Sequence, residues 1–199
     1  LFTEILKAAS KEEINYEGDP EKDLALLQYT GGTTGFPKGV MLTHNNLVAN
    51  TKMCDAWLYK YKEGEERVLA LLPFFHVYGM TTVLILSVMK GHKMIILPKF
   101  NATDTLKAIQ KQRPTLFPGA PTMYIGLLNH PDIAKYDLSS IDSCISGSAA
   151  LPVEVQEEFE KVTGGKLVEG YGLTETSPVT HANLLWDGPR KKGSIGLPW

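Results

Sequence analysis

The chain lacks the compositional extremes that mark several classes of protein. It has only two cysteines in 199 residues, too few for a disulfide framework, and 20 Lys and Arg nearly balance 22 Asp and Glu, for a net charge of −2. The lack of a basic excess argues against a nucleic-acid-binding protein. With 43% hydrophobic and 21% charged residues, the composition is that of a globular domain, which excludes a disordered tail and a collagen-like fibre. No secretory leader is visible, so a reduced, cytoplasmic setting is expected.

One stretch lacks charge altogether. Between Arg67 and Lys90, 22 residues carry no Lys, Arg, Asp or Glu, which is long enough to span a bilayer on count alone. Pro73, His76 and Gly79 interrupt the stretch, and this pattern favours a soluble core. The stretch is expected to hold a buried strand, a turn and a buried helix, at 68–72, 73–79 and 81–89.

Short β-rich runs alternate with helical patterns along the rest of the chain. Further strands are expected at 24–29, 40–42, 93–97, 115–117, 143–145 and 166–168. Helices are expected at 45–61, in a segment capped by Thr103 that ends before Pro114, and in a segment with Pro152 at its first position that ends at Gly164. This alternation predicts an α/β fold, a largely parallel sheet flanked by helices. Ligands of such sheets bind beyond the carboxyl ends of the strands.

The densest cluster of polar and glycine residues follows the first expected strand. Residues 29–39 read YTGGTTGFPKG. Glycines let backbone N–H groups converge on an anion, threonine hydroxyls add donors, and Lys38 adds a mobile positive charge. The run is not a Walker A loop, which needs Gly-Lys-Ser/Thr, because Lys38 stands between Pro37 and Gly39. The sequence therefore predicts a phosphate-binding loop containing Thr30, Gly31, Gly32, Thr33, Thr34, Gly35, Lys38 and Gly39.

A second cluster follows the last expected strand. Residues 168–178 read VEGYGLTETSP. Tyr171 offers an aromatic face for a purine, and Thr174 can donate a hydrogen bond to a phosphate. Glu175 supplies a hard anionic oxygen of the kind that Mg²⁺ prefers.

Two further segments carry weaker signals. Residues 72–79 read LPFFHVYG, in which His76 beside aromatic residues is by itself more often a core residue than a functional one. Residues 145–151 read ISGSAAL, small residues that suit either a flat base lying against backbone or a plain tight turn.

These four segments, in their order along the chain, resemble the signatures of the adenylate-forming superfamily. The spelling of residues 29–35 is most similar to that of bacterial long-chain fatty-acid–CoA ligases. The resemblance implies that a fatty carboxylate attacks the α-phosphorus of ATP to give an acyl-adenylate and pyrophosphate. The thiol of coenzyme A, a co-substrate, then displaces AMP. Neither step needs a protein nucleophile, so positioning and charge neutralisation do most of the chemistry.

The resemblance also implies roles for individual residues. Lys38 and the glycine loop would hold the β- and γ-phosphates, and Thr174 the α-phosphate. Glu175 and Thr30 would hold magnesium, while His76 would orient the carboxylate. The adenine would be bordered by Gly147, Ser148 and Ala149, and by Glu169, Gly170, Tyr171 and Gly172. Because the chain is itself at −2 and ATP carries about four negative charges, binding would depend on local neutralisation by Mg²⁺ and Lys38 within a screening length of ~8 Å.

The resemblance covers nearly the whole chain, but the chain corresponds only to a central part of such an enzyme. Residues 1–199 are expected to be one partial domain, within the large ATP- and acyl-binding domain. Leu1 is not an initiator methionine, and a ribose-binding aspartate, a hinge and a C-terminal lid domain with the adenylating lysine would follow Trp199. The fragment alone is therefore expected to be inactive, although its parent is an acid–thiol ligase.

Several alternatives stay open at this point. The acid could be aromatic or of medium chain length, or the acyl group could be loaded onto a carrier protein. A non-catalytic nucleotide-binding module is the alternative of another class. The expected partners are a fatty acid, ATP and coenzyme A, with no nucleic acid, while the oligomeric state and peripheral membrane contact of the parent are left open. The histidines and cysteines show no ligand spacing for zinc.

Overall fold

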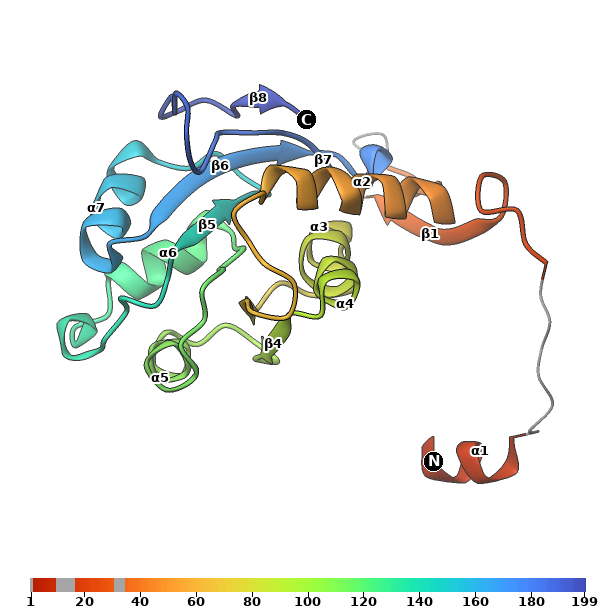
Figure 1. The fold of residues 1–199 in the computed structure, drawn as a ribbon, viewed down its shortest axis with the longest axis horizontal. Helices are drawn as coiled ribbons and strands as arrows, with labels where there is room; N and C mark the ends of the chain where they lie inside the picture. The colour runs from red at the N-terminus through yellow and green to blue at the C-terminus, as the bar shows by residue number, and fades with distance from the viewer. Residues whose placement is uncertain (1, 10–16, 31–34) are drawn as a thin grey trace.

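The computed structural model describes residues 2–9, 17–30 and 35–199, which form a mixed α/β fold (Figure 1). Four strands are parallel: β3 (Arg67–Ala70), β4 (Lys93–Ile96), β5 (Ser143–Ser146) and β6 (Lys166–Gly172). β7 (Val179–Ala182) and β8 (Leu197–Pro198) continue the sheet in antiparallel orientation after β6. Single parallel bridges from Leu116 to Val68 and to Ser143 join β3 to β5. The expected α/β fold with a parallel sheet is confirmed, with an antiparallel extension at one edge.

Helices cover both faces of this sheet. One layer contains α5 (Ala102–Gln112), α6 (Pro121–Leu128) and α7 (Val153–Thr163). The other contains α2 (His44–Trp57) and a continuous helical segment made of α3 (Val77–Gly79), η1 (Met80–Ile85) and α4 (Leu86–Lys90), whose middle part is a π-helix. Further short turns are η2 (Ile133–Lys135) and η3 (Thr174–Thr176), and α1 (Phe2–Ala8) lies apart from the sheet in Figure 1.

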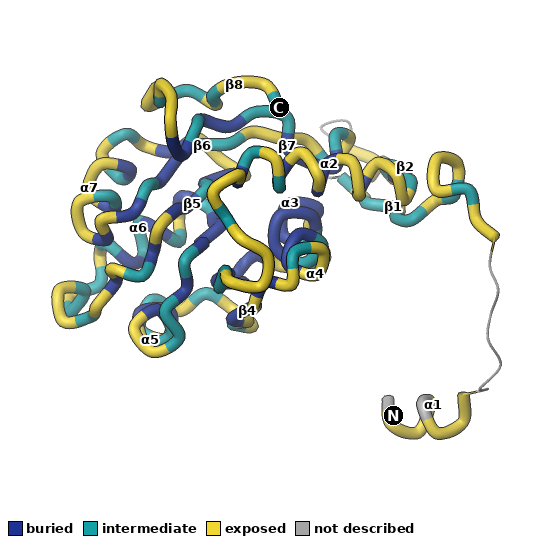
Figure 2. Tube along the Cα trace, viewed as in Figure 1, coloured by how far each residue is buried: buried dark blue, intermediate teal, exposed yellow. Residues whose placement is uncertain are grey.

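Strand residues alternate between two hydrophobic cores because successive side chains point to opposite faces of a sheet. In β3, Leu69 packs with the core under α5, α6 and α7, whereas Val68 and Ala70 pack with the core under α2 and η1. In β5, Cys144 packs with the first of these cores and Ile145 with the second. Figure 2 shows the buried residues concentrated on the strands and on the inner sides of the helices. Both cysteines are buried free thiols, as the sequence predicts.

A β-hairpin carries the glycine-rich segment. β1 (Leu24–Thr30) pairs antiparallel with β2 (Lys38–Thr43), with Thr30 opposite Lys38. Thr43 then caps α2 through a reciprocal pair of hydrogen bonds with Asn46. The expected strands at 24–29 and 40–42 are therefore confirmed, and they form one hairpin.

Three expected helix boundaries are wrong. α2 ends at Trp57, four residues before the expected end at Tyr61, because the Tyr59 and Tyr61 rings turn away to pack edge-on against Trp186. α5 is capped by Asn101, whose Oδ1 accepts from the Asp104 N–H at 3.0 Å; the Thr103 hydroxyl instead bonds to His130. Pro152 lies at the cap of α7 and Val153 is its first residue.

Other expected elements also differ in extent. Residues 73–79 do not form one turn, since His76 caps a helix that begins at Val77. Residues 115–117 contribute single bridges and no regular strand. The strand expected at 166–168 continues to Gly172 as β6, which carries the Glu-Gly-Tyr-Gly segment into the sheet. No helix within the described ranges combines the length and apolar character needed to cross a membrane.

Candidate active site

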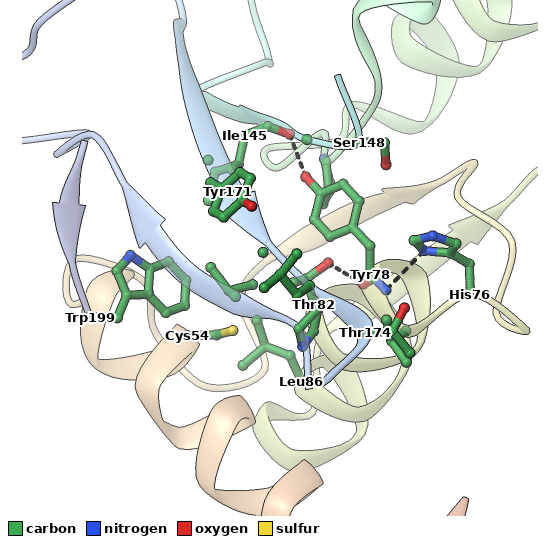
Figure 3. Close-up of a pocket in the computed structure, with 18 of the residues that line it drawn as sticks. Cys54, His76, Tyr78, Thr82, Leu86, Ile145, Ser148, Tyr171, Thr174 and Trp199 are labelled. Atoms are coloured by element: carbon green, nitrogen blue, oxygen red, sulfur yellow. Dashed lines mark hydrogen bonds between the residues drawn. The ribbon is translucent and has the colours of Figure 1, made fainter. Parts of the chain in front are cut away.

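A cavity of about 500 Å³ lies beyond the carboxyl ends of β3, β5 and β6 (Figure 3). Four separate stretches of the sequence converge on it. Its lining includes Thr30 and Lys38 from the hairpin, and His76 from the segment after β3. It also includes Gly147 and Ser148 after β5, and Gly170, Tyr171, Gly172, Thr174 and Glu175 at and just after the end of β6. The sequence analysis singled out all of these residues. This is the position at which open α/β sheets bind their ligands.

Other residues of the expected site lie elsewhere. Gly35, Gly39, Ala149 and Glu169 do not line this cavity. Gly31, Gly32, Thr33 and Thr34 fall outside the residues that the structure describes. Glu169 is half-buried in β6, and burial raises the pKa of its carboxyl, while a hydrogen bond from the Leu151 backbone opposes the shift.

His76 occupies a defined orientation at the rim. Its Nδ1 accepts a hydrogen bond from the Tyr78 backbone N–H at 3.2 Å, as the cap of the helix that begins at Val77. A neutral imidazole with Nδ1 as acceptor carries its proton on Nε2. His76 can therefore donate from Nε2 to an anion in the cavity, which its exposed side chain lines.

Tyr78 closes one side of the cavity. Its hydroxyl donates to the Ile145 carbonyl oxygen at 2.6 Å, and its ring lies beside Gly147 (Figure 3). A Cβ added at Gly147 would lie only 3.0 Å from the Tyr78 ring, so packing against this ring favours glycine here. The next residue, Ser148, has a φ of 72°, a left-handed conformation that is uncommon for a residue with a side chain and is often found at functional sites.

The turn η3 presents Thr174 and Glu175 at the rim. The Thr176 hydroxyl organises this turn, because it accepts from the Leu173 N–H at 3.1 Å and its one proton faces both the Leu173 carbonyl at 2.9 Å and the Pro178 carbonyl. The sequence analysis assigned Thr176 no role, although a threonine three residues after the start of a turn is a local capping signal. Glu175 is left exposed, with its carboxylate available to the cavity.

The donor set at the rim fits a hard divalent cation. Glu175 and Lys38 are both exposed, and neither forms an ion pair within the described residues. Among the residues that the structure describes, the Thr30 hydroxyl makes a long hydrogen bond of 3.5 Å to the Lys38 carbonyl. A free carboxylate and a weakly bonded hydroxyl are oxygen ligands of the kind that Mg²⁺ accepts.

The floor of the cavity is apolar, and the sequence analysis did not anticipate it. It contains Cys54 of α2, Leu58 at the C-terminal cap of α2, and Thr82 and Leu86 from the opposite helical segment. Each pair is spaced i, i+4 and so shares a helix face, but the spacing does not reveal that the two faces meet. Leu116 and Trp199 complete the floor. Burial raises the pKa of the Cys54 thiol, so this side chain is a neutral part of the floor.

Comparison with known proteins identifies the family. The family model described as AMP-binding enzyme matches residues 2–199. The chain belongs to this family. It is 69% identical over 181 residues to the long-chain-fatty-acid–CoA ligase of Bacillus subtilis (strain 168), a match covering 91% of this chain and 32% of that protein. It is 37% identical over 198 residues to a probable 4-coumarate–CoA ligase of Dictyostelium discoideum, which covers 98% of this chain and 36% of the relative.

Solved structures of AMP-binding enzymes share the fold. ATP-bound MatB from Rhodopseudomonas palustris superposes with a TM-score of 0.84 at 30% identity, covering 98% of this chain and 38% of that chain. The long-chain-fatty-acid-CoA ligase FadD1 from Archaeoglobus fulgidus gives a TM-score of 0.82 at 27% identity, covering 98% and 40%. The chain spans about a third of the length of the curated relatives it matches. The resemblance to adenylate-forming enzymes is thus confirmed.

Proposed function

We propose that this chain is the central part of the large domain of an ATP-dependent long-chain fatty-acid–CoA ligase. The observation that carries the proposal is the single cavity that combines a polar rim with an apolar floor. The rim gathers the segments expected to bind phosphate and metal, and the floor suits the hydrocarbon part of a carboxylic acid. Residues 1–199 would form one part of that domain, with the lid supplied by another part of the enzyme.

The proposed reaction has two balanced steps. A carboxylate oxygen attacks the α-phosphorus of ATP, the bond to the β-phosphate oxygen breaks, and pyrophosphate leaves. The thiol of coenzyme A then attacks the acyl carbon, AMP leaves with the bonding electrons, and the thiol proton is released.

The chain's own side chains bind and orient the reactants in this scheme. Lys38 binds the departing phosphates through its flexible ammonium group, and Thr174 donates to the α-phosphate. The Nε2–H of His76 donates to the carboxylate and holds it in line with the phosphorus, while Tyr171 offers its ring to the adenine.

Glu175 and Thr30 are the residues proposed to hold Mg²⁺. The ion supplies positive charge that offsets the negative charge developing on the phosphate oxygens. A carboxylate without an ion-pair partner in the described chain supports this assignment.

The floor supports a long hydrocarbon substrate. Leu58, Leu86 and Leu116 are buried and contribute apolar surface to the lining of the cavity. Each methylene buried there contributes roughly 0.8 kcal/mol, about fourfold in affinity. Acids with longer chains are therefore expected to bind more tightly until the chain fills the available depth.

The test is acid-dependent exchange of labelled pyrophosphate into ATP by the full-length protein, followed by thioester formation with coenzyme A. A panel of hexadecanoate, octanoate and 4-coumarate, with coenzyme A replaced by an acyl-carrier protein in a parallel series, separates the alternatives. We expect the highest kcat/KM with hexadecanoate and coenzyme A. Exchange only with the aromatic acid, transfer only to the carrier protein, or nucleotide binding without exchange would each contradict the proposal.

A further inference from the structure

We propose that Asn50 and Thr81, two buried polar residues outside the cavity, are positioning residues that fix the Thr174–Glu175 turn relative to the rest of the site. The inference rests on the proposed function, because the purpose assigned to this turn is to bind phosphate and metal. Neither side chain lines the cavity, and neither is among the candidate site residues of the sequence analysis.

Asn50 holds the chain just after the turn. It lies on α2, is 4% exposed, and pairs with Val179 through both halves of its amide. Its Nδ2 donates to the Val179 carbonyl at 2.8 Å, and its Oδ1 accepts from the Val179 N–H at 3.2 Å. The side chain thus acts like a neighbouring strand for one residue of β7, 129 positions away in sequence.

Thr81 holds the same segment from the other helix. It lies in η1, is fully buried, and donates from its hydroxyl to the Ser177 carbonyl oxygen at 2.8 Å. Ser177 is the residue that ends η3, and it is in the left-handed conformation with a φ of 74°. Two side chains from two helices therefore fix the backbone on either side of Pro178.

Both helices are joined in sequence to an element that carries a rim residue. α2 follows directly on β2, whose first residue is Lys38 and which contacts η3. The helical segment that contains Thr81 begins immediately after His76. The hydrogen bonds of Asn50 and Thr81 therefore connect three parts of the rim through rigid elements: the Lys38 strand, the His76 cap and the Glu175 turn.

Because the hydrogen bonds of Asn50 and Thr81 are buried, a partner that is lost is not readily replaced. A buried carbonyl oxygen that loses its donor is left without a hydrogen bond, which favours a shift of the backbone toward another partner. Movement at Ser177 or Val179 would displace Glu175, which is only two residues from Ser177. Substitution of a residue that orients a metal ligand typically lowers metal affinity or activity by roughly 10–100-fold.

Thr81→Val in the full-length protein tests the proposal, because it removes the hydroxyl while keeping the shape. Thr81→Ser keeps the hydroxyl and is the conservative variant. Thr51→Val is the matched control: Thr51 is also fully buried in a helix, but its hydroxyl donates to the Leu47 carbonyl of its own helix at 2.8 Å. Asn50→Asp, which keeps an acceptor and loses the donor to Val179, is an independent second variant.

Two measurements are made on each protein. One is the Mg²⁺ concentration that gives half-maximal acid-dependent pyrophosphate exchange, and the other is the binding of Mn²⁺ in the presence of ATP, followed by electron paramagnetic resonance. We expect Thr81→Val and Asn50→Asp to weaken metal binding by roughly tenfold or more in both measurements. Thr81→Ser should stay close to wild type, and Thr51→Val should lower only the melting temperature.

The proposal is overturned if Thr81→Val and Asn50→Asp lower the melting temperature as Thr51→Val does but leave metal affinity within twofold of wild type. If Thr81→Val does not fold, Asn50→Asp alone decides by the same criterion. A wild-type protein without acid-dependent exchange would instead contradict the proposed function. The Mn²⁺ binding comparison would still decide whether Asn50 and Thr81 position Glu175.

Discussion

Lys38 and Glu175 carry opposite charges at the rim of one cavity, yet neither is neutralised by an ion pair within the described residues. Some charges elsewhere in the described chain are paired, as Lys90 is with Asp55 at 3.1 Å and Arg190 is with Glu160. A rim that keeps a cation and a carboxylate apart is suited to a ligand that brings both phosphate and metal. The two side chains therefore give separate predictions.

Lys38→Ala is expected to slow acid-dependent pyrophosphate exchange by about 10²–10³-fold, because a positioned charge that stabilises the departing phosphates is lost. The melting temperature should not change, since Lys38 is exposed. Lys52→Ala, at an exposed position of α2 away from the cavity, is the control and should retain the wild-type rate. An unchanged rate in Lys38→Ala would remove this residue from the proposed site.

Glu175→Gln keeps the size of the side chain and removes its charge. The Mg²⁺ concentration for half-maximal exchange should rise by roughly 10–100-fold, with a smaller effect at saturating metal. Titration of the exchange rate with Mg²⁺ measures the shift. Glu158→Gln, exposed on α7, should give the wild-type curve. Overlapping curves for Glu175→Gln and wild type would assign the metal to other ligands.

Candidate site residues could be predicted from the sequence where their neighbours in the chain indicate their chemistry. A lysine among glycines and threonines, or a glutamate in Thr-Glu-Thr, identifies candidate ligands without a structure. The apolar floor could not be predicted, since Cys54 and Leu86 read as ordinary core residues until α2 and η1 are placed side by side. The roles of Asn50 and Thr81 could not be predicted for the same reason, because their hydrogen-bond partners lie 129 and 96 positions away in sequence.

At the scale of elements, the turn between α4 and β4 contains an unusual buried side chain. His92 is buried, and neither ring nitrogen has a hydrogen-bond partner in the described structure. Burial lowers the pKa of His92; the nearby charges of Glu66 and Asp55 oppose this shift, and that of Lys90 adds to it. The Lys62 backbone also faces the ring and favours its protonated form.

Stability is therefore expected to depend on pH through His92. In the unfolded chain the imidazole binds a proton near its ordinary pKa of about 6.5, whereas in the folded chain it does so only at lower pH. The unfolded state thus binds more protons between these values, and the melting temperature should fall as the pH decreases from about 6.5. His92→Gln should reduce this slope, and His44→Gln, at an exposed position, should not. Parallel melting curves for His92→Gln and wild type from pH 7.5 to 5 would contradict the assignment.

Element positions followed from the sequence better than their ends. The strands at 68–72 and 166–168 could be located from apolar runs, since burial on both faces of a sheet requires them. The strand at 24–29 could also be located, although β1 lies in a two-stranded hairpin with exposed apolar side chains. Their ends depend on tertiary contacts. α2 stops where Tyr59 and Tyr61 meet Trp186, and α5 begins where Asn101, not Thr103, can cap it.

At the scale of the whole molecule, the sheet separates two cores with different surroundings. The core under α5, α6 and α7 includes none of the residues that line the cavity and contains the packed rings of Phe117, Tyr124 and Phe159. The core under α2 and η1 includes residues of the cavity floor. The alternating order of strands and helices predicted the layers, but not which layer would contain the cavity.

Phe159→Ala should therefore reduce stability without changing substrate preference. Loss of a fully buried ring typically costs about 3–5 kcal/mol, which should lower the melting temperature markedly. The order of kcat/KM values across acids of different length should stay as in wild type. Leu86→Ala is the matched comparison, since it is equally buried but lies in the floor, and it should change that order. A changed order in Phe159→Ala would show that the two cores are coupled.

The alternation of β3, β5 and β6 has a consequence for how such enzymes diversify. Cys144 and Ile145 are neighbours in sequence, as are Leu167 and Val168, yet within each pair one residue faces the core under α5, α6 and α7 and the other faces the side that contains the cavity. Odd and even positions of one short strand are thus expected to tolerate substitution for different reasons. A change on the cavity side would bear on the ligand that the proposed site accepts, while a change at an intervening position would bear on the packing that preserves the fold.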